Sequence, residues 1–336
     1  MTSFASRMRA AIGRKELALK HIPRVFLGFL FIFIVYRVKR LRRRDYVICG
    51  PARPGPSYTL WKLCMLSGIR LVQADERPDR FGRQPLARIW HNNVTWEERE
   101  HAGYLNGRCT DISKRHVDRV LGDVFGFSTA IDPTTFRGQA VMKPDENCSG
   151  VGVLIELPVK PEDVSPDHIY QRLVDNTIGN GLVREYRVTV LLGVITDVVR
   201  QDRLEEGRLI GRGAGGTRGA QNMRAEEAFS ADDIARILKF CDRIGLDFGE
   251  LDILPDRAEG RLYILDANKT PTTMVKGEAF RIDRMRTLMK RAETFARLLK
   301  SHGIRPPATG APRERYVEIG NSGHGRPVVQ AFSKAR

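Results

Sequence analysis

The sequence predicts an α+β protein built from more than one lobe. Short apolar strands alternate with amphipathic helices along the chain, as in folds whose helices cover sheets. Residues 45–75 read as a βαβ unit, and residues 249–271 read as two apolar strands that each end in carboxylates. With 336 residues, the chain is long enough for two or three lobes with sizeable cores.

The remaining elements follow from local signals. In the βαβ unit, strands at 46–49 and 69–73 flank a helix capped by Ser57, after a Gly- and Pro-rich turn. Further helices are expected at 96–102, 111–120, 230–244 (N-capped by Ser230) and 278–301. Strands are expected at 129–133, 139–143, 153–156, 169–174 and 185–199, the last broken near Gly193. Residues 205–223 are rich in Gly and Arg and are expected to be mobile.

Charge is concentrated at the two ends of the chain. The net charge is +16, of which residues 1–44 hold +11, with twelve Lys/Arg against the single acid Glu16, and residues 302–336 hold +4. The body is therefore nearly neutral, which argues against a nucleic-acid-binding protein. Its five cysteines are scattered and form no CxxC pair, which indicates a reducing compartment and no structural zinc.

The N-terminal segment contains an apolar run of twelve residues, Val25 to Tyr36, followed by six basic residues within 37–44. As a helix the run spans about 18 Å, against about 30 Å of bilayer hydrocarbon, so a spanning helix is not expected. Two readings stay open. The run lies on or in an anionic membrane surface at the inner face, or it is buried in an N-terminal layer of the fold. We expect four parts: this segment (1–44), a βαβ domain (45–104), a larger domain (105–302) and a disordered basic tail (303–336).

Chemistry is most concentrated in the hairpin at 249–271. Asp252 follows an apolar strand, and the next strand delivers Asp266 and Asn268, which share a face because they are two residues apart. Oxygen ligands gathered on apolar strands favour a hard cation such as Mg²⁺. The alternative is that these acids are solvated turn residues.

Four features occur in a fixed order. A loop at 106–114 leads into a helix, the strand 140–144 carries Lys143 before a Gly-containing loop, a strand opens at 184–188, and the acidic hairpin follows. This order resembles the ATP-grasp superfamily over about residues 105–300. The resemblance implies two α+β lobes that clamp ATP, preceded by a small βαβ pre-grasp domain.

The resemblance also implies a role for each matching position. Lys114 and Lys143 would contact phosphates, under a loop that contains Ser149, Gly150 and Gly152. A hinge strand would lie against adenine, with a neighbour near the ribose: Gln171, Arg172, Leu173, Val174 and Asp175. Asp252, Asp266 and Asn268 would hold Mg²⁺. Arg187 and Arg200 would be catalytic and face the transferring phosphate or an anionic substrate. Two positions depart from the family pattern, since Asp266 replaces a Glu and Thr272 replaces a Gly.

The implied activity is ATP- and Mg²⁺-dependent ligation of a carboxylate to an amine through an acyl-phosphate. The substrates would be small molecules related to the cell envelope or to polysaccharides, and the protein would be cytoplasmic and peripheral at the inner membrane face. The alternatives are a small-molecule kinase on the same scaffold and a non-catalytic nucleotide-binding scaffold. No Ser-His-Asp or Cys-His set is evident, and the seven histidines show no metal-ligand spacing.

Overall fold

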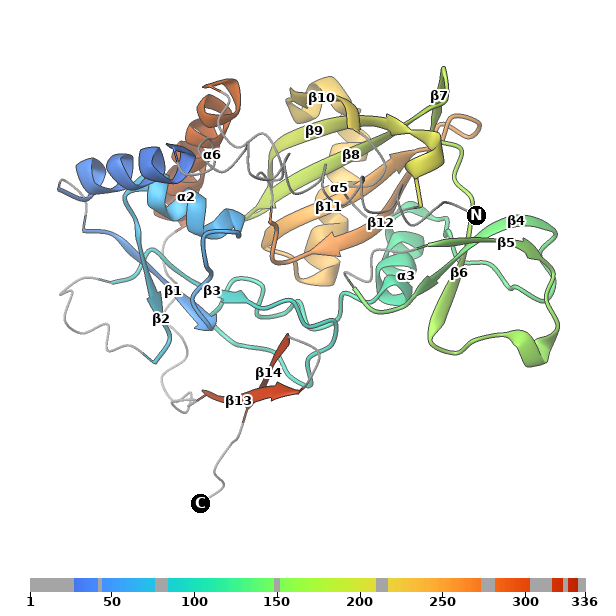
Figure 1. Cartoon of the computed structure of the whole chain (residues 1–336), viewed down its shortest axis with the longest axis horizontal. Helices are drawn as coiled ribbons and strands as arrows, with labels where there is room; N and C mark the ends of the chain where they lie inside the picture. The colour runs from blue at the N-terminus through green and yellow to red at the C-terminus, as the bar shows by residue number, and fades with distance from the viewer. Residues whose placement is uncertain are drawn as a thin grey trace, which may run out of the picture.

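The protein contains three main sheets that follow one another along its long axis (Figure 1). The structure, a computed structural model, describes residues 27–41, 44–75, 84–147, 152–209, 217–272 and 282–302, together with the backbone of strands 316–322 and 326–331. Helices and strands are mixed throughout, which confirms the α+β prediction.

The first lobe is built on a parallel three-stranded sheet in the order β2-β1-β3, with strands β1 (Tyr46–Pro51), β2 (Arg70–Gln73) and β3 (Ala87–His91). Helix α2 (Thr59–Ser67) joins β1 to β2, which confirms the βαβ unit, although the N-cap is Tyr58 rather than Ser57. The last helix, α6 (Ile282–His302), packs here, and the buried Ser67 Oγ donates to the Ala292 carbonyl oxygen at 2.7 Å.

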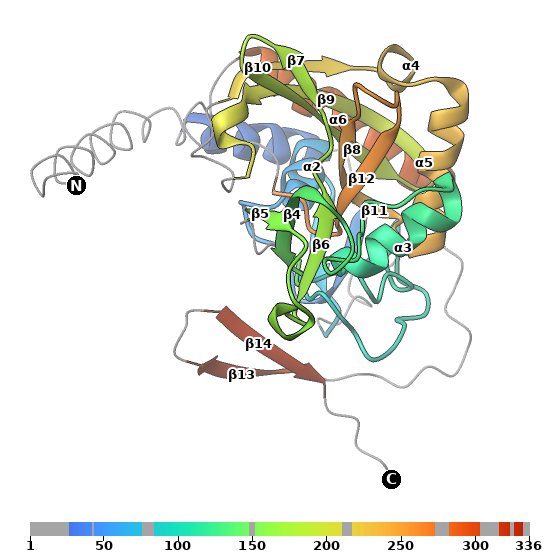
Figure 2. The ribbon, with the colours of Figure 1, turned by 90° about the vertical axis from the view of Figure 1, so that its right-hand side faces the viewer.

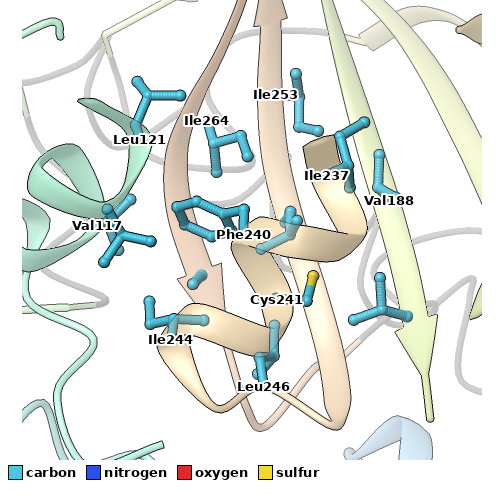
Figure 3. Packing of buried hydrophobic residues seen from close by; sticks show 14 of the residues in the cluster. Val117, Leu121, Val188, Ile237, Phe240, Cys241, Ile244, Leu246, Ile253 and Ile264 are labelled. Atoms are coloured by element: carbon cyan, nitrogen blue, oxygen red, sulfur yellow. The ribbon is translucent and has the colours of Figure 1, made fainter. Parts of the chain in front are cut away.

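The central lobe is a six-stranded antiparallel sheet. Its order is β10 (Thr217–Met223), β9 (Val194–Leu204), β8 (Leu182–Leu191), β11 (Phe248–Pro255) and β12 (Leu262–Asn268), with β7 (Thr177–Gly179) paired to β8. Helices α5 (Ala231–Ile244), α4 (Ala225–Ala228) and α3 (Lys114–Phe125) cover one face. Figure 3 shows the buried core there, where Phe240 of α5 meets Ile264 of β12 and Leu121 of α3. The opposite face carries the polar side chains.

The third lobe is an antiparallel sheet in the order β5-β4-β6, with strands β5 (Val153–Leu157), β4 (Gly138–Pro144) and β6 (His168–Arg172). It lies beyond α3 at the far end of the molecule from α6 (Figure 1), and it stands in front of the central sheet when the molecule is turned by 90° (Figure 2). The described loops also contain two short 3₁₀ turns, at Pro161–Asp163 and Glu205–Gly207.

Three predicted elements differ from the structure. Residues 96–102 are not helical, because the amides of Glu97 and His101 donate to the carbonyls of Thr110 and Gly107, each at 2.8 Å, rather than along a helix. Residues 129–133 form only an isolated bridge at Ala130, since Asp118 of α3 accepts the neighbouring backbone amides. Residues 205–223 include strand β10, while 210–216 lie outside the described residues.

The structure also adds to what the sequence predicts for the two ends of the chain. Within the tail that the sequence predicts to be disordered, the backbone of β13 (Tyr316–Ser322) and β14 (Arg326–Ala331) forms an antiparallel pair. Residues 27–41 form a helix whose Ile32 is only 4% exposed in the core with α2 and α6, so part of the apolar run is buried in the fold. No helix among the described residues is both long and apolar enough to cross a membrane.

Candidate functional site

The open face of the central sheet gathers the charged residues that the sequence had placed in separate motifs. Strand pairing aligns Arg187 of β8, Asp252 of β11 and Asp266 of β12 in one row across the sheet. The adjacent row brings Glu250 beside Asn268. The positions between them alternate to the helix-covered face, where they pack in the core. Two of the four predicted features, the strand at 184–188 and the acidic hairpin, therefore converge on one surface.

Arg187 and Asp252 form a close ion pair at the centre of this surface. The Arg187 Nη2 lies 3.0 Å from Asp252 Oδ1, its Nε donates to the same oxygen at 3.1 Å, and Glu250 Oε2 is 3.8 Å from Nε. Burial on its own would lower the pKa of Arg187, but the charges of Asp252 and Glu250 outweigh it and raise that pKa. Arg187 thus stays charged and holds two acids of the site.

Lys143 faces these acids from the third lobe. Burial lowers the pKa of Lys143 to about 8, with the charges of Lys114 and Arg208 acting in the same direction and those of Asp266 and Asp252 opposing them. Because two carboxylates of the central sheet and two cations of other elements all shift its pKa, Lys143 lies between the third lobe and the central sheet. A group with such a perturbed pKa in this position is a candidate for binding an anion.

Lys114 and Gly152 flank Lys143. Lys114, at the start of α3, is 7% exposed and donates from Nζ to the Glu146 carbonyl oxygen at 2.6 Å, just after β4. A Cβ on Gly152 would come within 3.0 Å of Val141 Cγ1 and 3.4 Å of Lys143 Cε. The absent side chain at Gly152 therefore leaves backbone close to the lysine, as a phosphate-covering loop requires. Ser149 and Gly150 lie outside the described residues.

The predicted hinge divides into residues with different surroundings. Gln171 is 3% exposed and donates from Nε2 to Thr129 Oγ1 at 2.7 Å, while its buried Oε1 accepts no hydrogen bond among the described residues. Arg172 leaves the opposite face of β6, donates to the Tyr263 hydroxyl at 3.2 Å and pairs with Glu259 at 3.1 Å. Gln171 is thus the better candidate for contact with a base.

The predicted hinge residues after β6 have side chains that are packed or held by local hydrogen bonds. The side chain of Val174 is buried in the core, its carbonyl oxygen accepts from Arg208 Nη2 at 2.6 Å, and Leu173 before it is half-buried. Asp175 Oδ1 accepts from the Thr177 hydroxyl at 2.6 Å, and this bond together with the Thr177 amide lowers the pKa of Asp175. Asp175 is half-buried, and this local turn fixes its carboxylate.

Asp252, Asp266 and Asn268 supply two carboxylates and an amide oxygen on neighbouring strands. Asn268 Oδ1 accepts from the Thr270 amide at 2.9 Å and, at a longer 3.5 Å, from the Thr270 hydroxyl. Mg²⁺ commonly takes one or two carboxylates and completes its shell with water and substrate phosphates, so this donor set fits it. Within the described residues, no cluster of three or more His, Cys, Asp or Glu is arranged around a common point.

Arg200 is not part of this surface. It pairs with Tyr186 across β8 and β9, whereas Arg187 pairs with Val199, so the two arginines leave the sheet on opposite faces. Arg200 lies 3.8 Å from Asp202 instead. The sequence predicts that Arg187 and Arg200 face the transferring phosphate or an anionic substrate, and the register places Arg187, but not Arg200, on the acidic face. The structure adds Glu250 and Arg208, and the two-residue spacing of Glu250 and Asp252 could have predicted the former.

A buried ion pair fixes the end of β12, directly after Asn268. Lys269 is fully buried and donates to Glu97 Oε1 at 2.6 Å and to the Cys109 carbonyl oxygen at 3.2 Å. Glu97 Oε2 also accepts from Trp90 Nε1 at 2.7 Å and lies 2.8 Å from His101 Nε2. This network ties the first lobe to the acidic hairpin.

The start of β11 is fixed by one side chain. Asn106, at φ 61°, accepts on Oδ1 from the amides of Asp247 and Phe248 at 2.9 and 2.8 Å, and its Nδ2 donates to the Phe248 carbonyl oxygen. Asn tolerates this left-handed conformation better than most residues. The loop predicted from residues 106–114 therefore positions the acidic hairpin as well as Lys114.

No protein-family profile and no curated protein matches this sequence. Among solved structures, the ATP-grasp ligase PsnB complexed with a minimal precursor is similar at 15% identity and a TM-score of 0.45, over 74% of this chain and 98% of that one. D-alanine–D-alanine ligase from Bacillus anthracis is similar at 13% identity and a TM-score of 0.41, over 77% and 99%. The macrocyclase MdnC from Microcystis aeruginosa, bound with precursor peptide MdnA, is similar at 13% and 0.40, over 74% and 98%. Because these TM-scores are below 0.5, the case for a shared activity has to come from the side chains of this chain.

Proposed function

We propose that this chain is an ATP-grasp enzyme, an ATP- and Mg²⁺-dependent ligase that joins a carboxylate to an amine through an acyl-phosphate. The observation that carries the proposal is the row of Arg187, Asp252 and Asp266 on the open sheet face, with Lys143 opposite it. Three motifs far apart in sequence meet there with the charges that bind and transfer a phosphoryl group.

The side chains suit this chemistry because phosphoryl transfer needs positioning and positive charge more than a protein nucleophile. Lys143 provides a cation for the α- and β-phosphates of ATP, Lys114 is a second phosphate-facing lysine, and Gly152 allows backbone to approach the phosphates. Asp252, Asp266 and Asn268 would hold Mg²⁺, which offsets phosphate charge when bound. Arg187, which is paired with Asp252, would stabilise the charge that develops in transfer.

In the proposed reaction, the acid substrate takes the γ-phosphoryl group of ATP and ADP leaves. The amine then attacks the carbonyl carbon of the acyl-phosphate, which releases phosphate and leaves an amide. For the substrates we propose small acids and amines of the cell envelope or of polysaccharides. We also propose that the protein works at the anionic inner face of a membrane, on the support of the +11 charge of residues 1–44.

The metal assignment is tested with Asp266→Asn and Asn268→Ala. Each should lower Mg²⁺-dependent ATP turnover by at least about 10²-fold, comparable to the loss of a major electrostatic stabiliser. Thermal unfolding should be nearly unchanged, because both side chains are half-exposed rather than packed in the core. Asp232→Asn, an exposed acid on α5, is the matched control and should turn over ATP like the wild type. Full activity in either site variant would remove the metal assignment.

The reaction type is tested with ATP labelled on the γ-phosphate and panels of candidate acids and amines. A ligase delivers the label to free phosphate and yields a product whose mass is that of acid plus amine minus water. Hydroxylamine added without amine should trap the acyl-phosphate as a hydroxamate. A stable labelled product without amine consumption would identify a kinase instead, and ATP binding without turnover would identify a scaffold.

A further inference from the structure

The helix at residues 27–41 has two apolar sides, and within the described part of the chain only one of them is covered. Ile32 is 4% exposed and lies in the core that α2 and α6 share, and the Phe29 ring meets Trp61 of α2 at 6.1 Å between centroids. On the other side, six large apolar side chains are 41 to 88% exposed: Leu27, Leu30, Phe33, Ile34, Val38 and Leu41. We name these six residues the apolar stripe.

The spacing of the apolar stripe makes it a continuous surface. Residues 27, 30, 34, 38 and 41 recur every three or four positions, so they line one side of the helix over its whole length. Single exposed apolar residues are ordinary, but a contiguous row of this length on a folded body marks an interaction surface. The helix therefore packs on the protein along one side, and its other side is an apolar surface that lipid or another protein could contact.

The charges around the apolar stripe select the partner. Residues 37–44 hold six Lys/Arg and no acid, and the exposed Arg37 lies on the same helix between Ile34 and Val38. Residues 1–26, which precede the helix, hold six more Lys/Arg and only Glu16 as an acid. An apolar row bordered by cations is complementary to a membrane with anionic headgroups, since acyl chains take the row and the headgroups take the cations.

We propose that the apolar stripe is the membrane-docking surface of this protein and lies flat in the interface of an anionic bilayer. This deepens, and rests on, the membrane association proposed above. Because Ile32 is held in the core, the docked helix is part of the fold rather than a detachable anchor. The helix lies at one end of the long axis and the β4–β6 lobe at the other (Figure 1).

The test is co-sedimentation of the full chain with vesicles of phosphatidylcholine, with and without phosphatidylglycerol, in the absence of ATP. The wild type should bind the anionic vesicles and bind neutral ones more weakly. The double variant Phe33→Ser/Ile34→Ser should bind anionic vesicles at least about tenfold more weakly, because two apolar side chains that would enter the lipid are lost. Ile178→Ser, which removes an exposed (39%) apolar residue from β7, is the matched control and should bind like the wild type.

Several outcomes would overturn the proposal. The first is that the wild type does not bind anionic vesicles. The second is that the Phe33/Ile34 variant binds them as strongly as the wild type. A third is a wild-type dimer that this variant converts to a monomer without any lipid binding, since the stripe would then pair with a second copy. ATP turnover of all variants is measured without vesicles and should be unchanged. Loss of the ligase assignment would leave the vesicle result standing, so the two failures are distinguishable.

Discussion

Replacing Lys269 with Met tests whether the first lobe positions the acidic hairpin. The substitution keeps much of the side-chain volume but leaves Glu97 buried without its cation, 2.6 Å away in the wild type. Removing one partner of a buried pair costs about 3–5 kcal/mol. Glu97 keeps its contacts with Trp90 and His101, so we expect a loss near the lower limit, about 3 kcal/mol. Glu97→Gln combined with Lys269→Met removes both charges and should recover at least about 1 kcal/mol of that loss.

Urea denaturation gives the free energy of unfolding of the two single variants, the double variant and the wild type. ATP turnover is measured under conditions where each variant is folded. Lys269 directly follows Asn268, so loss of its ion pair should displace this proposed metal ligand. The Lys269→Met variant should therefore also turn over ATP roughly tenfold more slowly. A Lys269→Met variant within about 0.5 kcal/mol of the wild type, or costs that simply add in the double variant, would refute the reasoning.

Three further predictions concern single positions. Arg187→Gln should lower ATP turnover by at least about 10²-fold while Arg200→Gln changes it less than about threefold, since only the first arginine lies on the acidic face; equal losses in steady-state assays would contradict this. Gly152→Val should raise the KM for ATP by roughly tenfold through crowding of the lysine beside it, whereas Gly219→Val, with open space around it, should not. Burial lowers the pKa of His91 to about 4, so between pH 6.5 and 4 the unfolded chain binds a proton that the folded chain does not. The free energy of unfolding should therefore fall by about 3 kcal/mol as the pH drops from 6.5 to 4. In urea denaturation across this range, His91→Gln should show a smaller dependence of the unfolding free energy on pH.

The sequence predicted best where a local signal decides the structure. Ser230 caps α5 and accepts the Asp233 amide, as the capping pattern indicates. Asp266 and Asn268 lie on one face because strand alternation has a period of two. The position of Arg200 could not be predicted in this way. Its face depends on the register between β8 and β9, which the turn at Leu192 and Gly193 and a bulge near Thr189 set together.

Long-range hydrogen bonds account for the other differences. The segment at 96–102 has a helix-compatible composition, but its amides bond to residues 107–110 and Glu97 is held by Lys269, which lies 172 positions away. A sequence window cannot contain such a partner, so tertiary contacts override the local preference. The same reason applies to the N-terminal helix, where composition gives an apolar run but only the packing of Ile32 shows which side is covered.

The charges of the site suggest why nucleotide and metal should arrive together. Among the described residues, five cations (Lys62, Lys114, Lys143, Arg187 and Arg208) lie close to three carboxylates (Glu250, Asp252 and Asp266), so opposite charges largely offset one another by themselves. This offset allows these groups to be held in a partly buried place at tolerable desolvation cost. A polyphosphate alone would add several negative charges beside three acids. A divalent cation held by Asp252, Asp266 and Asn268 would offset them, and it would also compete with Arg187 for Asp252. The Arg187–Asp252 pair therefore stabilises the surface before nucleotide binds, and it places a guanidinium that release from Asp252 would make available to the phosphoryl oxygens.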